Sequence, residues 1–156
     1  EVDLSQRYAA LGLRLLCCNP DVRKMAVEEN MIGPFHAMAH SSILDYQKSA
    51  SVSLASMSLD ETNKVVLMKK GALKDILCLC NSSDVIVKQH AVFAAANMAN
   101  SPELHRDFLN AGGIEILRDV DLSGDVMIAR DVARAFSSLS TNESAKSIIV
   151  DKNVLK

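Results

Sequence analysis

The histidines offer the most direct route to metal chemistry in this sequence. His36 and His40 lie four residues apart, a spacing that puts two imidazoles on one helix face, where they can chelate a metal ion. No third ligand stands near them in sequence, and no glutamate follows the first histidine as it does in zinc proteases. His90 and His105 belong to no carboxylate or thiol motif. We therefore predict surface or partly buried histidines, no metal and no cofactor.

The cysteines occur as neighbours, at Cys17 and Cys18 and again at Cys78 and Cys80. Neither spacing matches a zinc motif or a disulfide framework, so we interpret them as reduced thiols that act as small buried hydrophobes in a cytoplasmic protein. A redox-active or lipidated cysteine is the second interpretation. The sequence shows no nucleophile–base pair and no paired carboxylates with a pocket signature, and we predict that the protein is not an enzyme.

The composition is that of one helical domain without a strong charge. The 156 residues are 49% hydrophobic but only 4% aromatic, which favours closely packed helices built from alanine, leucine and methionine. The formal net charge of −2 gives no general attraction to nucleic acid or to an anionic membrane. No apolar run reaches the roughly 18 residues of a membrane span.

Helix start signals recur at a fixed interval of 41 residues. Asn19, Asp60, Ser101 and Asn142 are all good N-cap residues, and each is followed by proline or glutamate, which suit the first helical turn. Internal similarity at such a period indicates a repeat protein. We expect a helix to start after each of these four positions.

Two further sets of residues recur at the same 41-residue interval. About ten residues after each start stand Asn30, Gly71, Gly112 and Asn153, residue types that tolerate the left-handed conformation ending a helix. Later in the unit, Ser41, Ser82 and Ser123 precede another apolar-periodic segment, and we expect them to cap it. Between these marks the apolar residues recur at helical spacing, and no segment shows sustained strand alternation.

Three helices in each unit, with a glycine after the short first helix, resemble the armadillo repeat. The matching segments are GALKDILCLC from Gly71, GGIEILRDV from Gly112, and the pair VIVKQHAVFAAANMAN and VMIARDVARAFSSLST. HEAT repeats have a similar length but two helices and no regular glycine. The resemblance implies an all-α, right-handed solenoid of about 3.5 three-helix repeats, whose third helices line a concave groove.

The 41-residue register divides residues 1–156, a single armadillo-type domain, into repeats. Residues 1–18 form a partial repeat, 19–59, 60–100 and 101–141 are repeats, and 142–156 begin another. Because solenoids need capping ends, we interpret the chain as a slice of a longer array. Some armadillo scaffolds are tethered to organelle membranes by N-terminal acylation, and such an anchor would lie outside this chain.

Basic residues recur on the face that the resemblance assigns to the groove. The position of Gln89 carries Arg7, Lys48 and Arg130 in the other repeats, and Arg134 lies one turn beyond Arg130. Together with apolar neighbours they predict a partner segment that is acidic and partly apolar. The alternative is that these are solvated surface charges.

Phe93 and Asn97 have the aromatic and asparagine spacing by which armadillo import adaptors bind extended peptides. Their equivalents are Val52 and Ser56, and Arg134 and Ser138, so the regular ladder of an import receptor is missing. Asn97 either binds a ligand backbone or satisfies a carbonyl inside the solenoid. The predicted groove set is Lys48, Val52, Ser56, Gln89, Phe93, Asn97, Arg130, Arg134 and Ser138.

These features predict a cytoplasmic, non-enzymatic scaffold or adaptor that binds a protein or peptide. One alternative is a single-stranded RNA reader, which would need stacking residues in several repeats and a basic groove; retention on poly(U) would reveal it. Another is self-association through apolar helix faces exposed at the unfinished ends of the array. Leu4, Leu11 and Leu15 add apolar surface on the groove side, and we interpret them as packing beneath a preceding segment.

Overall fold

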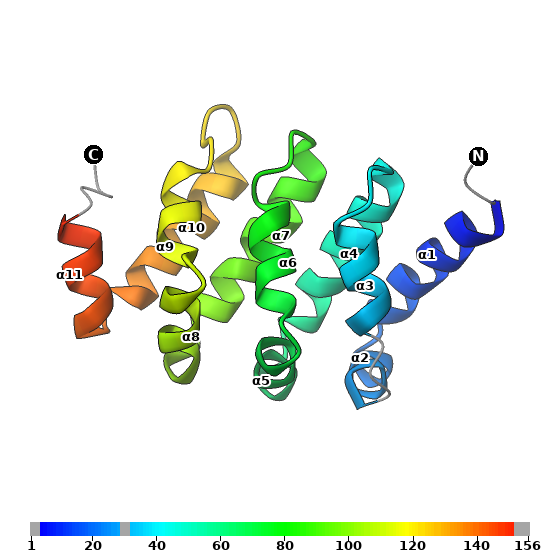
Figure 1. Cartoon of the computed structure of the whole chain (residues 1–156), viewed down its shortest axis with the longest axis horizontal. Helices are drawn as coiled ribbons and strands as arrows, with labels where there is room; N and C mark the ends of the chain where they lie inside the picture. Colours follow the sequence, from blue (N-terminus) through cyan, green and yellow to red (C-terminus); the bar gives the residue numbers. More distant parts are fainter. Residues whose placement is uncertain (1–3, 29–31, 152–156) are drawn as a thin grey trace.

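The computed structural model describes residues 4–28 and 32–151, and every regular element in these two ranges is a helix. The predictions for Asn30 and Asn153 fall outside the described residues. Figure 1 shows the helices stacked side by side in one elongated row. This is the all-α solenoid expected from the 41-residue period.

Each step along the row contributes two short helices and one longer one. The short first helices are α2 (Pro20–Glu28), α5 (Glu61–Lys69) and α8 (His105–Asn110), the last preceded by the 3₁₀ turn η1 (Pro102–Leu104). The second are α3 (Ile32–Ala39), α6 (Ala72–Leu79) and α9 (Gly113–Asp119). The third are α4 (Leu44–Met57), α7 (Val85–Ala99) and α10 (Val126–Leu139). The row begins with α1 (Leu4–Cys17) and ends with α11 (Glu143–Asp151).

Three of the four predicted helix starts are capped by side chains as expected. The carboxylate of Asp60 accepts hydrogen bonds from the amides of Thr62 and Asn63, and Asn19 and Asn142 cap α2 and α11 in the same way. Ser101 precedes η1 but makes no capping bond. Its hydroxyl donates to Glu61 Oε2 at 2.7 Å instead, tying this turn to the preceding repeat.

The junction glycines are confirmed, whereas the predicted serine caps are wrong. Gly71 (φ 80°) and Gly112 (φ 75°) are left-handed residues directly before α6 and α9. The third helices are capped by Asp84 and Asp125, two residues after the predicted serines, and α4 starts after Ile43 without a side-chain cap. A carboxylate at this place not only accepts amide hydrogen bonds but also interacts favourably with the positive N-terminal end of the helix dipole, which a hydroxyl does not.

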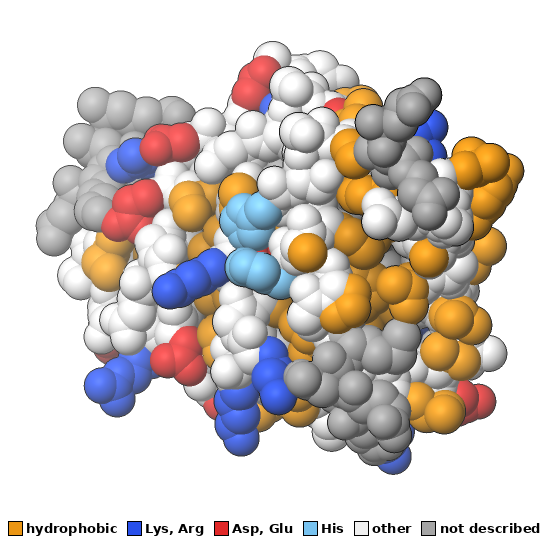
Figure 2. Space-filling model, turned by 45° about the vertical axis from the view of Figure 1, so that its right-hand side comes forward, with side chains coloured by type: hydrophobic (Ala, Val, Ile, Leu, Met, Phe, Trp, Pro, Cys, Tyr) orange, Lys and Arg blue, Asp and Glu red, His pale blue; other side chains and the backbone are white. Residues whose placement is uncertain are grey.

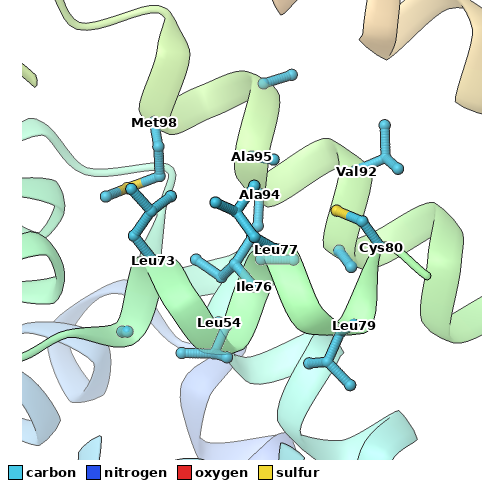
Figure 3. Packing of buried hydrophobic residues seen from close by; sticks show 14 of the residues in the cluster. Leu54, Leu73, Ile76, Leu77, Leu79, Cys80, Val92, Ala94, Ala95 and Met98 are labelled. Carbon is cyan, nitrogen blue, oxygen red and sulfur yellow. The ribbon is translucent and has the colours of Figure 1, made fainter. Parts of the chain in front are cut away.

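The core follows the apolar stripes of the sequence. Ile76 and Leu77 of α6 pack against Leu54 of α4 and against Ala95 and Met98 of α7, and all five are buried (Figure 3). Alanines let α7 approach its neighbours closely, so this helix is buried on most of its circumference between α4, α6 and α10. In the described ranges no helix is both long and apolar enough to cross a bilayer.

Candidate functional site

The nine predicted groove residues lie on three successive third helices. Helix α4 carries Lys48, Val52 and Ser56. Helix α7 carries Gln89, Phe93 and Asn97, and α10 carries Arg130, Arg134 and Ser138. Because α4 packs on α7 and α7 on α10, the three sets lie on adjacent helices. Arg130 is exposed, Asn97 is buried, and the other seven side chains are partly exposed.

The recurring basic position makes contacts between repeats. Lys48 Nζ lies 3.2 Å from Asp84 Oδ2, and Gln89 Nε2 donates to Asp125 Oδ2 at 2.5 Å. Both carboxylates also cap the helix they start, and the Ile128 amide, together with the Gln89 side chain, holds the pKa of Asp125 below its usual range. Arg7 Nη1 lies at 4.0 Å from Asp45 Oδ2. Arg7 and Lys48 therefore face carboxylates of the following repeat, whereas Arg130 pairs with Asp131 beside it on α10, at 3.1 Å.

Phe93 borders a surface pocket between α7 and α10. The pocket has a volume of about 250 Å³ and is lined by Gln89, His90, Phe93, Met127, Arg130 and Asp131. The Arg134 guanidinium lies over the Phe93 ring, 5.3 Å from its centroid, and pairs with Asp131 at 3.4 Å. This arrangement offers a ligand an apolar floor, with Arg130 at the rim and the carboxylate of Asp131 paired to it.

Asn97 is engaged inside the protein. Its Nδ2 donates to Ser58 Oγ at 2.9 Å, and its Oδ1 accepts from Arg134 Nη1 at 2.8 Å. The side chain is 6% exposed. Of the two roles that the sequence left open, the structure displays the internal one, although the partners are side chains and not a carbonyl. Asn97 thereby fixes Arg134 above Phe93.

A second pocket lies at the equivalent place two repeats earlier. It has a volume of about 330 Å³ between α1 and α4 and is lined by Leu4, Arg7, Tyr8, Leu11, Arg14, Asp45, Lys48 and Ser49. Six of these residues stand two 41-residue repeats before the six residues that line the pocket beside Phe93. The two pockets are thus two copies of one site in the repeat.

Sequence reasoning missed part of this second pocket. It identifies Arg7 as a basic position, but it gives Tyr8 and Arg14 no role and treats Leu4 and Leu11 mainly as packing residues. The signal that could have found the pocket is a projection of residues 4–17 onto a helix, which places Arg7, Leu11 and Arg14 on one face.

The histidine pair has a third potential ligand, which lies far from it in the sequence. Asp75 of α6 lies between the two rings, with Oδ1 at 2.8 Å from His36 Nδ1 and at 2.9 Å from His40 Nε2. Cys78 Sγ lies 4.0 Å from the other nitrogen of His40. Cys78, His40 and Asp75 thus place a thiol next to a histidine that contacts a carboxylate, an arrangement that the sequence did not reveal. Neither pocket described above borders Cys78. Cys18 and Cys78 are exposed, so the prediction of buried cysteines is wrong for these two.

Solved structures resemble the whole solenoid. No protein-family model and no curated protein matches the sequence. A computationally designed armadillo repeat protein for modular peptide recognition is 18% identical over 96% of this chain and 64% of its own, with a TM-score of 0.88. A designed armadillo repeat protein in complex with the peptide (KR)4 is 17% identical over 99% and 67% of the two chains, with a TM-score of 0.86.

A natural protein shares the same architecture. The armadillo-repeats-only protein of Plasmodium falciparum is 21% identical over 86% of this chain and 59% of its own, with a TM-score of 0.69. The chain spans less than two thirds of the length of this protein and of the first designed one. Together with the junction glycines and the three-helix units, these matches show that the chain has an armadillo-type repeat fold.

Proposed function

We propose that this protein is a non-enzymatic scaffold that binds an extended segment of a partner protein across α1, α4, α7 and α10. The observation that carries this proposal is the pair of equivalent pockets, one beside Leu11 and one beside Phe93. A surface that repeats its pockets at a fixed interval suits a ligand that also repeats, and an extended peptide does so.

The interval between the pockets sets the spacing of the ligand side chains. Neighbouring packed helices lie about 8–10 Å apart, so two steps along the row cover roughly 16–20 Å. An extended chain advances about 3.3 Å per residue, which places the two anchoring side chains some five or six residues apart. Leu11 and Phe93 favour apolar anchors at both places.

The charges around the first pocket favour an acidic segment. Arg7, Arg14 and Lys48 border this pocket with the carboxylate of Asp45, and the cations are in excess even with Asp84 paired to Lys48. Carboxylates of a ligand would add charge-assisted hydrogen bonds and steer its approach. The designed protein described above is in complex with the basic peptide (KR)4, and we expect the opposite charge preference here. The free cysteines fit a reducing compartment, and we propose the cytoplasm as the site of action.

A selection experiment tests the proposal without a known partner. Random twelve-residue peptides are displayed and enriched on the immobilised protein, and the affinity of the enriched peptides is then measured by fluorescence anisotropy. We expect acidic sequences with two apolar residues five or six positions apart. The double variant Arg7→Glu/Arg14→Glu should bind them about tenfold more weakly or worse, because like charges would then face each other.

The matched control is Lys24→Glu on α2, an exposed cation that does not line either pocket. This variant should bind the peptides as the wild type does, and both variants should keep their far-UV circular dichroism. Enriched peptides without acidic character, or equal affinity for the double variant and the control, would refute the proposed charge preference. Peptides whose binding is insensitive to Leu11→Ser and Met127→Ser would refute the proposed surface.

A further inference from the structure

The histidine cluster joins two repeats through side chains able to bind a metal ion. His36 and His40 come from the α3 segment, and Asp75 comes from α6 of the next repeat. One ligand atom from each residue lies within 4.8 Å of the other two. Figure 2 shows histidine side chains together on an exposed face of the molecule. The cluster is open to solvent through the two rings, whose side chains are 66% and 47% exposed.

Asp75 is unusual for its place in the repeat. The equivalent positions are Pro34 and Ile116, and the position of His36 becomes Leu77 one repeat later. The carboxylate is only 3% exposed, and the two imidazoles are its sole ion-pair partners among the described residues. Burying a carboxylate is unfavourable unless a positive group compensates it, and an apolar residue would serve packing equally well. A bound cation would provide the compensation.

We propose that His36, His40 and Asp75 form a binding site for a divalent transition-metal ion, with zinc as its natural probe. Two imidazole nitrogens and one carboxylate oxygen are a donor set that Zn²⁺ accepts, with water completing the coordination. In a tetrahedral zinc site each ligand atom lies about 2.0–2.2 Å from the metal, which places neighbouring ligand atoms roughly 3.3–3.6 Å apart. The two nitrogen–oxygen distances of 2.8 and 2.9 Å would open by roughly half an ångström to admit the ion.

The histidine–aspartate hydrogen bonds can be replaced by bonds to a metal ion. In the metal-free cluster His36 Nδ1 and His40 Nε2 both lie within hydrogen-bond distance of Asp75 Oδ1, and an ionised carboxylate accepts a hydrogen bond from each. When the ion binds, the inner nitrogen of each ring becomes a ligand and gives up its proton, and the outer nitrogen carries the N–H. The outer nitrogen of His40 then faces Cys78 Sγ, a weak acceptor 4.0 Å away, which helps to orient the ring.

The ion would crosslink the repeats 19–59 and 60–100 by coordinating residues of both. It binds groups that come together only in the folded solenoid, so it stabilises the folded state by mass action. This role is independent of the peptide surface, because none of the three ligands lines either pocket described above.

Titration of the metal-free protein with ZnCl₂ in a calorimeter tests the proposal. The wild type should bind one ion per chain, whereas His36→Gln and His40→Gln should each raise the Kd roughly 100-fold or abolish binding. His90→Gln is the matched control, since this histidine lies on α7 outside the cluster, and it should bind zinc as the wild type does. Zinc should also raise the melting temperature of the wild type and of His90→Gln but not of His36→Gln.

Three results would overturn the assignment. The first is a wild type that binds no zinc at micromolar concentrations. The second is binding that His36→Gln and His40→Gln leave unchanged. The third is binding lost in Cys78→Ser but kept in His36→Gln, which would make the site a thiolate site.

Discussion

Phe108 and Gly113 form a pair of complementary size at one repeat junction. Phe108 is fully buried, and a Cβ added at Gly113 would lie 2.5 Å from Phe108 Cδ1 and closer still to Cε1. One repeat earlier the same two positions are Leu67 and Ala72, both also fully buried. A large side chain thus accompanies glycine, and a smaller one accompanies alanine. The pair predicts that Gly113→Ala destabilises the protein and that Phe108→Leu rescues it.

The loss of stability expected for Gly113→Ala is the difference between two opposing effects. Overpacking a filled core costs about 1–3 kcal/mol, and here the fully buried Phe108 ring would have to move away from the added methyl group. Replacing glycine by alanine in a helix returns at most about 1 kcal/mol. We therefore expect Gly113→Ala to lower the free energy of unfolding by about 1–2 kcal/mol. Phe108→Leu alone should cost about 1 kcal/mol or somewhat more through lost contacts.

Urea unfolding followed by far-UV circular dichroism measures the double-mutant cycle. The double variant should come within about 1 kcal/mol of the wild type, giving a coupling free energy of about 1–3 kcal/mol between the two sites. Gly33→Ala in α3 is the control, because nothing lies within 4 Å of its added Cβ, and it should leave stability unchanged or slightly raised. Additive single effects, or a Gly113→Ala variant more stable than the wild type, would refute the reasoning.

Three further predictions concern single sites. Gly71→Ala should lower the free energy of unfolding by about 1–2 kcal/mol in urea, because φ is 80° there. Iodoacetamide at pH 8 should alkylate the exposed Cys78 and spare Cys80, whose pKa burial raises to about 12, as peptide mass spectrometry will show. Burial, with nearby Arg14, lowers the pKa of His90 below its ordinary value of 6.5. Stability should therefore fall as the pH drops from 6.5 towards that lower pKa, and His90→Gln should remove this slope in urea titrations.

The periodic features of the fold could be predicted from the sequence because each depends on local backbone chemistry. Asn19, Asp60 and Asn142 cap helices by bonding amides two or three residues away, and Gly71 adopts a conformation that few other residues tolerate. Such signals act within a single turn. The same reasoning failed at Ser101, whose hydroxyl bonds to Glu61 of the preceding repeat.

The candidate sites were less predictable because they depend on how far one repeat is turned and shifted on the next. Asp75 reaches His36 from 39 positions away, and Arg134 reaches Asn97 from 37 positions away. Neither offset equals the 41-residue period, so register alone did not reveal the contact. The pockets likewise form between helices, at distances that a projection of one helix does not contain.

Methyl NMR of ¹³C-labelled methionine, titrated with a selected acidic peptide, tests the proposed binding surface most directly. Met127 lines the Phe93 pocket and is 50% exposed, whereas Met25 on α2 is 59% exposed and lines neither pocket. The proposal predicts that the Met127 resonance shifts in proportion to peptide bound while the Met25 resonance stays in place. A shift at Met25 with none at Met127 would contradict binding across the third helices.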